Sequence, residues 1–167
     1  MTTLAITSGR LVGRAAELDR LRDQFEFGTR LVTLWGPGGI GKTCLATHFA
    51  KSETNAWFCD LSDASDADGV LSSVARGFDI ALSPGTFTQE AARLGRVLAA
   101  RGRVFVILDN FEQVAAHAAT TVGRWLSAAP DARFLVTSRE KLRLKEEVSF
   151  ELPPLSLPEP GGDAELT

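Results

Sequence analysis

The residues from Gly36 to Thr43 have the types and spacing that bind a phosphate chain. They read Gly-Pro-Gly-Gly-Ile-Gly-Lys-Thr and match the pattern G-x-x-x-x-G-K-[ST]. Glycines let the backbone approach an anion so closely that several N–H groups point at one phosphate. The lysine would then meet the β- and γ-phosphates, and the threonine hydroxyl would bind Mg²⁺. We therefore predict a nucleotide triphosphate site, because a plain glycine-rich turn does not require all of these positions.

An acidic residue stands at the end of a second apolar run. Asp109 follows Val104 to Leu108, which is continuously apolar and predicts a strand buried on both faces. The carboxyl ends of parallel strands meet at one edge of the sheet, where ligands collect. We expect Asp109 to hold Mg²⁺ there, directly or through water. The alternative is an aspartate that only caps a helix or turn.

Three further residues could act on a bound nucleotide. Asn110 can orient a water molecule but cannot take its proton, whereas Glu112 could act as a base if the turn aims it inward. Glu112 could equally be a glutamate that is stabilised by the first turn of a helix. Arg139 follows the apolar run that ends at Thr137, and its planar guanidinium suits a γ-phosphate. A surface salt bridge is the alternative for Arg139.

Alternating strands and helices must position these side chains. Short apolar runs predict five strands, at Leu31 to Trp35, Ala56 to Leu61, Val104 to Leu108, Arg133 to Thr137 and Glu147 to Leu152. Helical patterns lie between them, at Ala15 to Gln24, Lys42 to Lys51, Asp66 to Phe78, Thr88 to Ala100 and Phe111 to Ala129. This alternation predicts an α/β fold with a mostly parallel sheet between two layers of helices. The more polar runs, the second and the fifth, are expected near the sheet edges.

The composition excludes several other classes of protein. The chain has 167 residues, of which 44% are hydrophobic and 23% are charged, with a formal net charge of −3. These values are typical of a folded domain and give no overall positive charge for nucleic acid, so DNA contact would need another domain. Two cysteines, no signal-like start and no long apolar run lead us to expect a cytoplasmic protein without a membrane partner.

Taken together, the motifs resemble the STAND class of signal-transduction ATPases, which are related to AAA+ proteins and include the NB-ARC domains. Leu11 to Leu18 is similar to the amino-terminal h-h-G-R-x-x-E-L segment of this class, and Leu135 to Arg139 is similar to its sensor-1 strand and arginine. The sequence around Asp109, from Val106 to Glu112, is most similar to that of bacterial members, many of which are multidomain transcriptional regulators.

The resemblance implies a P-loop NTPase fold with a five-stranded parallel sheet in the order 5-1-4-3-2. It implies ATP or ADP as the ligand with Mg²⁺, slow hydrolysis, and oligomerisation of the ATP-bound state. In relatives, the segment that corresponds to Val12 to Arg14 lies against the adenine. The nucleotide-binding residues are then expected to be Val12, Gly13, Arg14, Pro37, Gly38, Gly39, Ile40, Gly41, Lys42, Thr43, Cys44 and Arg139. Lys42, Asp109, Glu112 and Arg139 would act in catalysis, and Thr43 and Asp109 would hold the metal.

Two departures from the family pattern limit what this chain is expected to do. Many relatives carry paired aspartates where this chain has Asp109 and Asn110, so the hydrolytic base is not assigned. Residues 1–152 are expected to form the nucleotide-binding domain, and residues 153–167 a Pro- and Gly-rich segment that leads to a helical lid in a longer protein. Without the lid, we expect hydrolysis to be slow or undetectable.

Three rival functions stay open at this point. The first is a scaffold that binds nucleotide without turnover, and the second is a kinase that phosphorylates a small molecule. The third is a guanine-specific switch, although no N-K-x-D motif follows the Asp109 strand.

Overall fold

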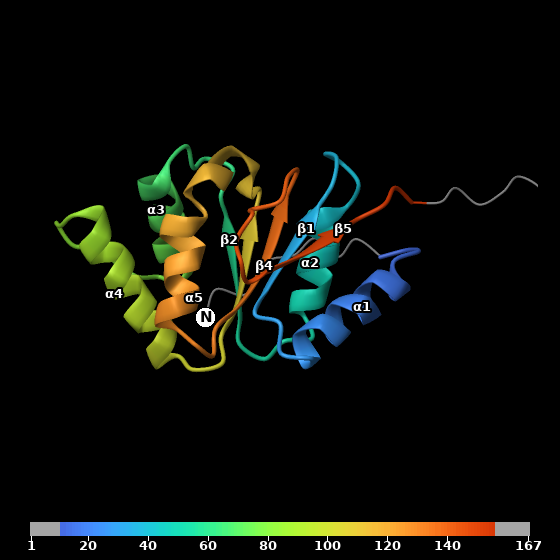
Figure 1. The fold of residues 1–167 in the computed structure, drawn as a ribbon, viewed down its shortest axis with the longest axis horizontal. Coiled ribbons are helices and arrows are strands. Elements are labelled where there is room, and N and C mark those ends of the chain that lie inside the picture. The colour runs from blue at the N-terminus through green and yellow to red at the C-terminus, as the bar shows by residue number, and fades with distance from the viewer. Residues whose placement is uncertain (1–10, 156–167) are drawn as a thin grey trace, which may run out of the picture.

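The computed structural model describes residues 11–155, which are built around a parallel sheet of five strands. The strands are β1 (Leu31–Trp35), β2 (Ala56–Asp60), β3 (Phe105–Asp109), β4 (Arg133–Ser138) and β5 (Glu147–Glu151). Their order is β2-β3-β4-β1-β5, which confirms the expected order counted from the other edge (Figure 1). Each predicted strand is present, and the two polar runs form the edge strands. All five carboxyl ends therefore meet at one edge of the sheet.

Helices cover both faces of the sheet, as expected for a three-layer α/β fold. The helices α1 (Ala15–Glu26) and α2 (Lys42–Ala50) lie on one face. The helices α3 (Ala67–Gly77), α4 (Phe87–Ala100) and α5 (Arg124–Ala128) lie on the other face, where α4 packs against α3 and α5 (Figure 1). The chain reaches α2 directly from β1, so the first turn of α2 stands at the carboxyl edge of the sheet.

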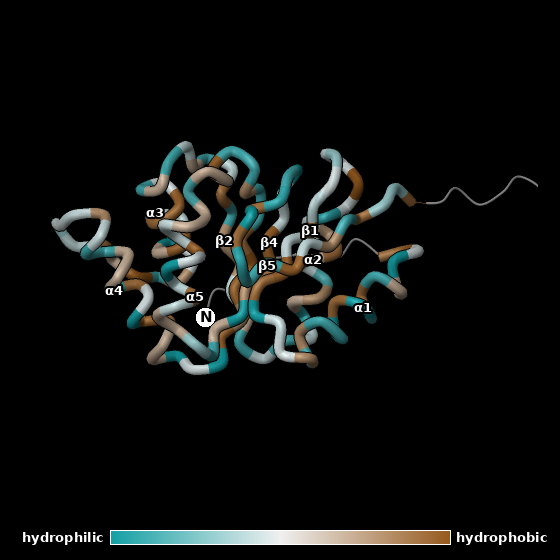
Figure 2. Tube along the Cα trace, in the orientation of Figure 1, coloured by the Kyte–Doolittle hydropathy of each residue, from teal (hydrophilic) through white to brown (hydrophobic). Residues whose placement is uncertain are grey.

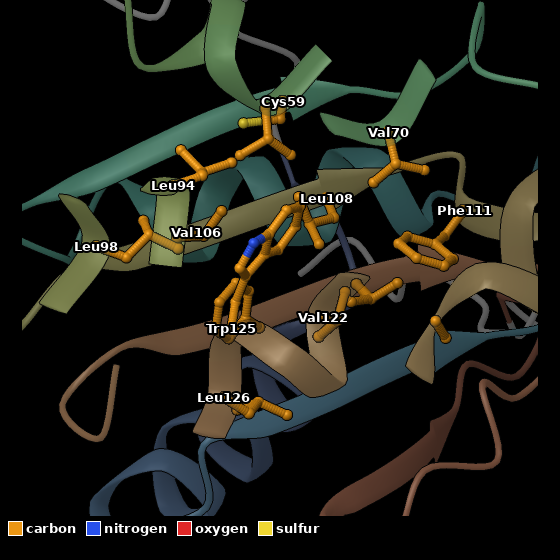
Figure 3. Close-up of a cluster of buried hydrophobic side chains, with 14 of the residues drawn as sticks. Cys59, Val70, Leu94, Leu98, Val106, Leu108, Phe111, Val122, Trp125 and Leu126 are labelled. Atoms are coloured by element: carbon orange, nitrogen blue, oxygen red, sulfur yellow. The ribbon is translucent and has the colours of Figure 1, made fainter. Parts of the chain in front are cut away.

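The strand β3 shows why the sheet is stable. All of its residues are buried, and they alternate between the two faces because successive side chains of a strand point to opposite sides. Val106 and Leu108 join the cluster under α3 to α5, whereas Phe105 and Ile107 join the cluster under α1 and α2. Figure 2 shows hydrophobic residues along the central strands, and Figure 3 shows Trp125 inside the larger cluster.

The predicted single helix from Phe111 to Ala129 is wrong. The structure contains a 3₁₀ segment, η1 (Phe111–His117), a π-helical turn, η2 (Ala119–Gly123), and only then α5. Val114 breaks the helical geometry with φ −120° and ψ 15°, and the hydroxyls of Thr120 and Thr121 both donate to the carbonyl oxygen of His117. Threonine side chains that compete for backbone carbonyls in this way disturb a regular α-helix.

The start of α4 also differs from the prediction. Its cap is Thr86 rather than Thr88, because the Thr86 hydroxyl accepts from the Gln89 N–H and the Gln89 side chain accepts from the Thr86 N–H. This reciprocal pair is a capping box, and it begins the helix at Phe87.

The described residues end inside the expected exit segment, residues 153–167. The N–H of Leu152 still donates to the carbonyl oxygen of Trp35 at 2.9 Å, and residues 153–155 have no regular secondary structure. Residues 156–167, the rest of that expected segment, lie outside the described residues, as do residues 1–10. Within residues 11–155, no helix has the length and apolar character needed to cross a membrane.

Candidate functional site

The glycine-rich loop joins β1 to α2 at the carboxyl edge of the sheet. Gly39 and Gly41 have φ of 79° and 95°, a left-handed conformation that residues with a side chain adopt only at a cost. Gly41 precedes the first residue of α2, and no side chain caps this helix end. The amides of the first turn are therefore free to bind an anion, and the helix dipole favours negative charge there.

The Lys42 side chain folds back on its own loop. Its Nζ donates to the carbonyl oxygens of Gly36 and Pro37, each at 2.8 Å. Burial lowers the pKa of this ammonium group, while the carboxylates of Glu112 and Asp109 oppose the shift. The lysine thus stands at the centre of the loop and close to both acidic residues named from the sequence.

The metal-ligand candidates Thr43 and Asp109 are brought into direct contact. The Thr43 hydroxyl on α2 donates to Oδ1 of Asp109 at 2.8 Å, although the two residues are 66 positions apart in the chain. The Thr137 hydroxyl on β4 donates to the same oxygen. Desolvation raises the pKa of the Asp109 carboxyl, and the two hydroxyl donors counteract this effect. A hydroxyl and a carboxylate are oxygen ligands of the kind that Mg²⁺ prefers.

Arg139 reaches from the end of β4 across the loop. Its Nε lies 3.7 Å from Oε1 of Glu112. Its guanidinium lies so close to Gly38 that a Cβ atom at this position would be 3.1 Å from Nη2. The Arg139 side chain is 68% exposed and that of Glu112 is 23% exposed. The candidate γ-phosphate contact, Arg139, and the candidate base, Glu112, therefore lie next to each other beside the loop.

The amino-terminal segment contacts the loop through one buried arginine. Arg14 is 4% exposed, and its guanidinium donates to the carbonyl oxygen of Ile40 at 3.1 Å and to the Glu17 carboxylate at 2.7 Å. Val12 is 68% exposed, and Gly13 has a φ of 74°. The expected adenine-binding segment thus lies against the loop, with Val12 open to solvent.

The remaining nucleotide-binding candidates lie in or next to the loop. Cys44, one residue after Thr43 on α2, is exposed. Pro37, Gly38 and Gly39 are exposed as well, whereas Ile40 is half-buried. Every site residue predicted from the sequence is therefore at the carboxyl edge of the sheet or adjoins it.

Sequence reasoning missed Asp60, and it considered Thr137 only as a residue that could hold a water or the phosphate. Thr137 holds Asp109, and Asp60 at the end of β2 accepts a hydrogen bond from Nδ2 of Asn110 at 3.2 Å. Asp60 could have been found because it closes a strand, but the second apolar run was taken to continue to Leu61. Hydrogen bonds from Ser62 and Asn110 outweigh desolvation and hold the pKa of the Asp60 carboxyl below its usual range.

Comparisons with known proteins identify the family of this chain. A family model described as AAA ATPase domain matches residues 10–138. The chain is 35% identical over 131 residues to Rv0890c of Mycobacterium tuberculosis, named as an HTH-type transcriptional regulator, and the match covers 77% of this chain. It is 32% identical over 138 residues to the regulatory protein AfsR of Streptomyces griseus, a match that covers 70% of this chain. The matches cover only 14% of each relative's length.

Among solved structures, Cdc6p from Pyrobaculum aerophilum has a similar fold. Its TM-score is 0.61 at 16% sequence identity, and the match covers 89% of this chain and 48% of that one. At this identity the likeness concerns the fold alone.

Proposed function

This chain belongs to the AAA ATPase domain family, and on that premise we propose that it is an adenine-nucleotide-binding switch domain of a STAND-type regulator. The family implies nucleotide binding. The loop from Gly36 to Thr43 would hold the phosphates of ATP or ADP, and the segment from Val12 to Arg14 would lie against the adenine. Thr43 and Asp109 would hold Mg²⁺, which neutralises phosphate charge when bound.

One observation carries this proposal, the 2.8 Å hydrogen bond between the Thr43 hydroxyl and Asp109. It joins the last residue of the phosphate-binding motif to the acidic end of a neighbouring strand. A Mg²⁺-nucleotide site needs this hydroxyl and this carboxylate on the same side of the phosphates. A glycine-rich turn without a ligand would not require the two residues to meet.

The switch would depend on whether a γ-phosphate is present. Arg139 lies over Gly38 and faces Glu112, so a γ-phosphate would compete with that carboxylate for the guanidinium. Loss of the γ-phosphate on hydrolysis would return Arg139 to Glu112 and bias the domain toward a resting state. A complete switch from 1:99 to 99:1 needs about 5.5 kcal/mol of differential binding, more than one arginine supplies. We therefore expect a lid from the longer protein to contribute.

The regulator relatives support a proposal for the role of the whole protein. Because this chain covers 14% of the length of Rv0890c and of AfsR, we propose that it works with other domains of a longer chain. In that setting, ATP would promote homo-oligomerisation, and contact with DNA would be made by another domain. Transcriptional or stress signalling is the expected output.

A scaffold that binds nucleotide without turnover is the second candidate. The contact of Glu112 with Arg139 favours it, because the candidate base faces a guanidinium group 3.7 Å away. Single-turnover hydrolysis of ATP by the longer protein separates the two candidates, since the scaffold would leave ATP intact.

Calorimetric titration of the chain with Mg²⁺-ATP, Mg²⁺-ADP and Mg²⁺-GTP tests the proposal. For the two adenine nucleotides we expect dissociation constants in the micromolar range, which correspond to a binding free energy of about −8 kcal/mol. We expect weaker binding of GTP. Lys42→Ala should weaken ATP binding about 100-fold or more with an unchanged circular dichroism spectrum. Lys51→Ala is the matched control, because it removes the same charge from an exposed position just after α2. Full affinity of the Lys42→Ala variant, or a preference for GTP, would overturn the proposal.

A further inference from the structure

The residue after Asp109 has an unusual backbone conformation. Asn110 has φ 64° and ψ 48°, a left-handed geometry that costs a residue with a side chain roughly 1–2 kcal/mol. Asparagine tolerates this geometry better than most residues, and such strained positions are concentrated at functional sites. Asn110 lies between β3 and η1, at the carboxyl edge where the proposed metal site stands.

Three hydrogen bonds fix Asn110 in this conformation. Its backbone N–H donates to the Thr137 hydroxyl at 3.0 Å, and its Nδ2 donates to Oδ2 of Asp109 at 3.1 Å and to Oδ1 of Asp60 at 3.2 Å. The carboxamide must present its nitrogen here, because the reverse orientation would set its oxygen against two carboxylates. Asn110 therefore links the ends of β2, β3 and β4.

Asp60 is held in place independently of Asn110. It is the last residue of β2 and pairs in register with Asp109 on β3. The backbone N–H of Ser62 donates to Oδ1 of Asp60 at 2.9 Å. The Asp60 carboxylate is thus a fixed acceptor against which the Asn110 carboxamide is oriented.

The effect on Asp109 follows from its two oxygens. Its Oδ1 accepts from the hydroxyls of Thr43 and Thr137, and its Oδ2 accepts from Asn110. Without Asp60, the carboxamide loses one of its two acceptors and is free to rotate. The second oxygen of Asp109 would then lose its fixed partner, although Asp60 itself does not contact Asp109 through a direct hydrogen bond.

We infer that Asp60 is a positioning residue of the Mg²⁺-nucleotide site, which it serves by orienting the Asn110 carboxamide that holds Asp109. This role rests on the proposed function. It assigns Asp60 no contact with the nucleotide and no part in proton transfer.

The test compares ADP affinity in Mg²⁺ with ADP affinity in EDTA, measured by calorimetry on the chain and its variants. The dissociation constant in EDTA divided by the dissociation constant in Mg²⁺ gives a ratio that measures the contribution of the metal separately from that of the loop. Asp60→Ala should lower this ratio about 3- to 10-fold and leave the affinity in EDTA unchanged. Asp60→Asn keeps an acceptor oxygen and should stay within twofold of the unmodified chain. Asp63→Ala is the charge control, since Asp63 is an exposed acid in the same loop.

A second variant tests the same path without changing Asp60. Asn110→Gly removes the carboxamide but accepts a φ of 64° without strain, so it avoids the folding defect that alanine would risk. It should lower the ratio as much as Asp60→Ala does. The double variant should lose no more than either single variant, because both act through one chain of contacts.

Three results would overturn the inference. They are an unchanged ratio in Asp60→Ala or Asn110→Gly, losses that multiply in the double variant, and an equal loss in Asp63→Ala. If the unmodified chain binds no ADP in either buffer, the proposed function fails. If it binds with a clear Mg²⁺ dependence and the variants match it, only the role of Asp60 fails.

Discussion

The two ends of the parallel sheet use arginine in different ways. At the amino end, Arg30 precedes β1, and its Nη1 donates to the carbonyl oxygens of Leu126 and Ala129 at 2.9 and 3.3 Å. These carbonyls belong to the end of α5, where a helix leaves acceptors without a partner. At the carboxyl end, Arg139 follows β4 and faces the Glu112 carboxylate at 3.7 Å. Arg30 donates to backbone carbonyls, whereas Arg139 contacts a carboxylate that a ligand can replace.

The asparagines at the two ends differ in the same way. Asn55, just before β2, donates to the carbonyl oxygen of Arg103 at 3.2 Å and accepts from the Trp57 indole at 2.8 Å. Asn110, just after β3, donates to two carboxylates in a strained conformation. At the amino end, Arg30 and Asn55 contact backbone carbonyls or an indole, whereas at the carboxyl end Arg139 and Asn110 contact carboxylates beside the glycine-rich loop. We therefore expect Arg30 to contribute to stability, and Arg139 to contribute to the proposed nucleotide binding.

In the comparison of the two arginines, the larger expected effect is on stability and comes from the amino end. Arg30→Ala should lower the free energy of unfolding by about 2 kcal/mol, because a hydrogen bond from a charged donor contributes roughly 1.5–3 kcal/mol. Urea denaturation followed by circular dichroism measures this loss, and calorimetry should find ADP affinity within twofold of the unmodified chain. The comparison breaks if Arg30→Ala instead weakens ADP and leaves stability unchanged.

A smaller and opposite pattern is expected at the carboxyl end. Arg139→Ala should weaken ATP about tenfold, which is about 1.4 kcal/mol, and ADP less than twofold, because only ATP carries the γ-phosphate. Its unfolding free energy should change by no more than about 1 kcal/mol, since an exposed ion pair contributes about 0–1 kcal/mol. The Arg30→Ala variant is the matched control. An equal loss of ATP and ADP affinity would remove the sensing role from Arg139.

Local sequence patterns were sufficient where the determining contacts are themselves local. Each strand was predicted because a short apolar run sits between turn residues, and the start of α2 was predicted because Gly41 and Lys42 belong to one contiguous motif. The order of the strands came from the family resemblance, since periodicity does not say which strand lies beside which. The region after Phe111 was mispredicted because apolar spacing alone does not reveal that Thr121 bonds to the His117 carbonyl.

The sequence motifs name most of the residues that meet at the candidate site, but they do not give the contacts between them. Thr43, Asp109 and Arg139 were found from motifs, whereas the link from Asp60 to Asn110 depends on the register between β2 and β3. That register joins segments separated by 50 residues and leaves no local trace. The contact between Arg139 and Glu112 is also non-local, because the two residues lie after different strands.

The smallest expected effect concerns how stability changes with pH, and it again contrasts the site with the rest of the fold. Burial raises the pKa of the Asp109 carboxyl, so the folded state keeps this proton to a higher pH than the unfolded state does. The contribution of Asp109 to stability therefore falls as pH rises above the ordinary carboxyl value of about 4. Without nucleotide or Mg²⁺, the Tm of Asp109→Asn minus the Tm of the unmodified chain should increase between pH 4 and 7.

Glu90 on α4 gives the control of opposite sign. Hydrogen bonds from the Ser83 N–H and the Arg93 guanidinium, both at 3.0 Å, hold the pKa of Glu90 below its usual range. The contribution of Glu90 to stability is present above the ordinary carboxyl value and is lost as pH falls through its lowered pKa. The Tm of the unmodified chain minus the Tm of Glu90→Gln should therefore increase as pH rises. Parallel Tm curves for Asp109→Asn and the unmodified chain would mean that burial of the Asp109 carboxylate has no cost in stability, and they would contradict its raised pKa.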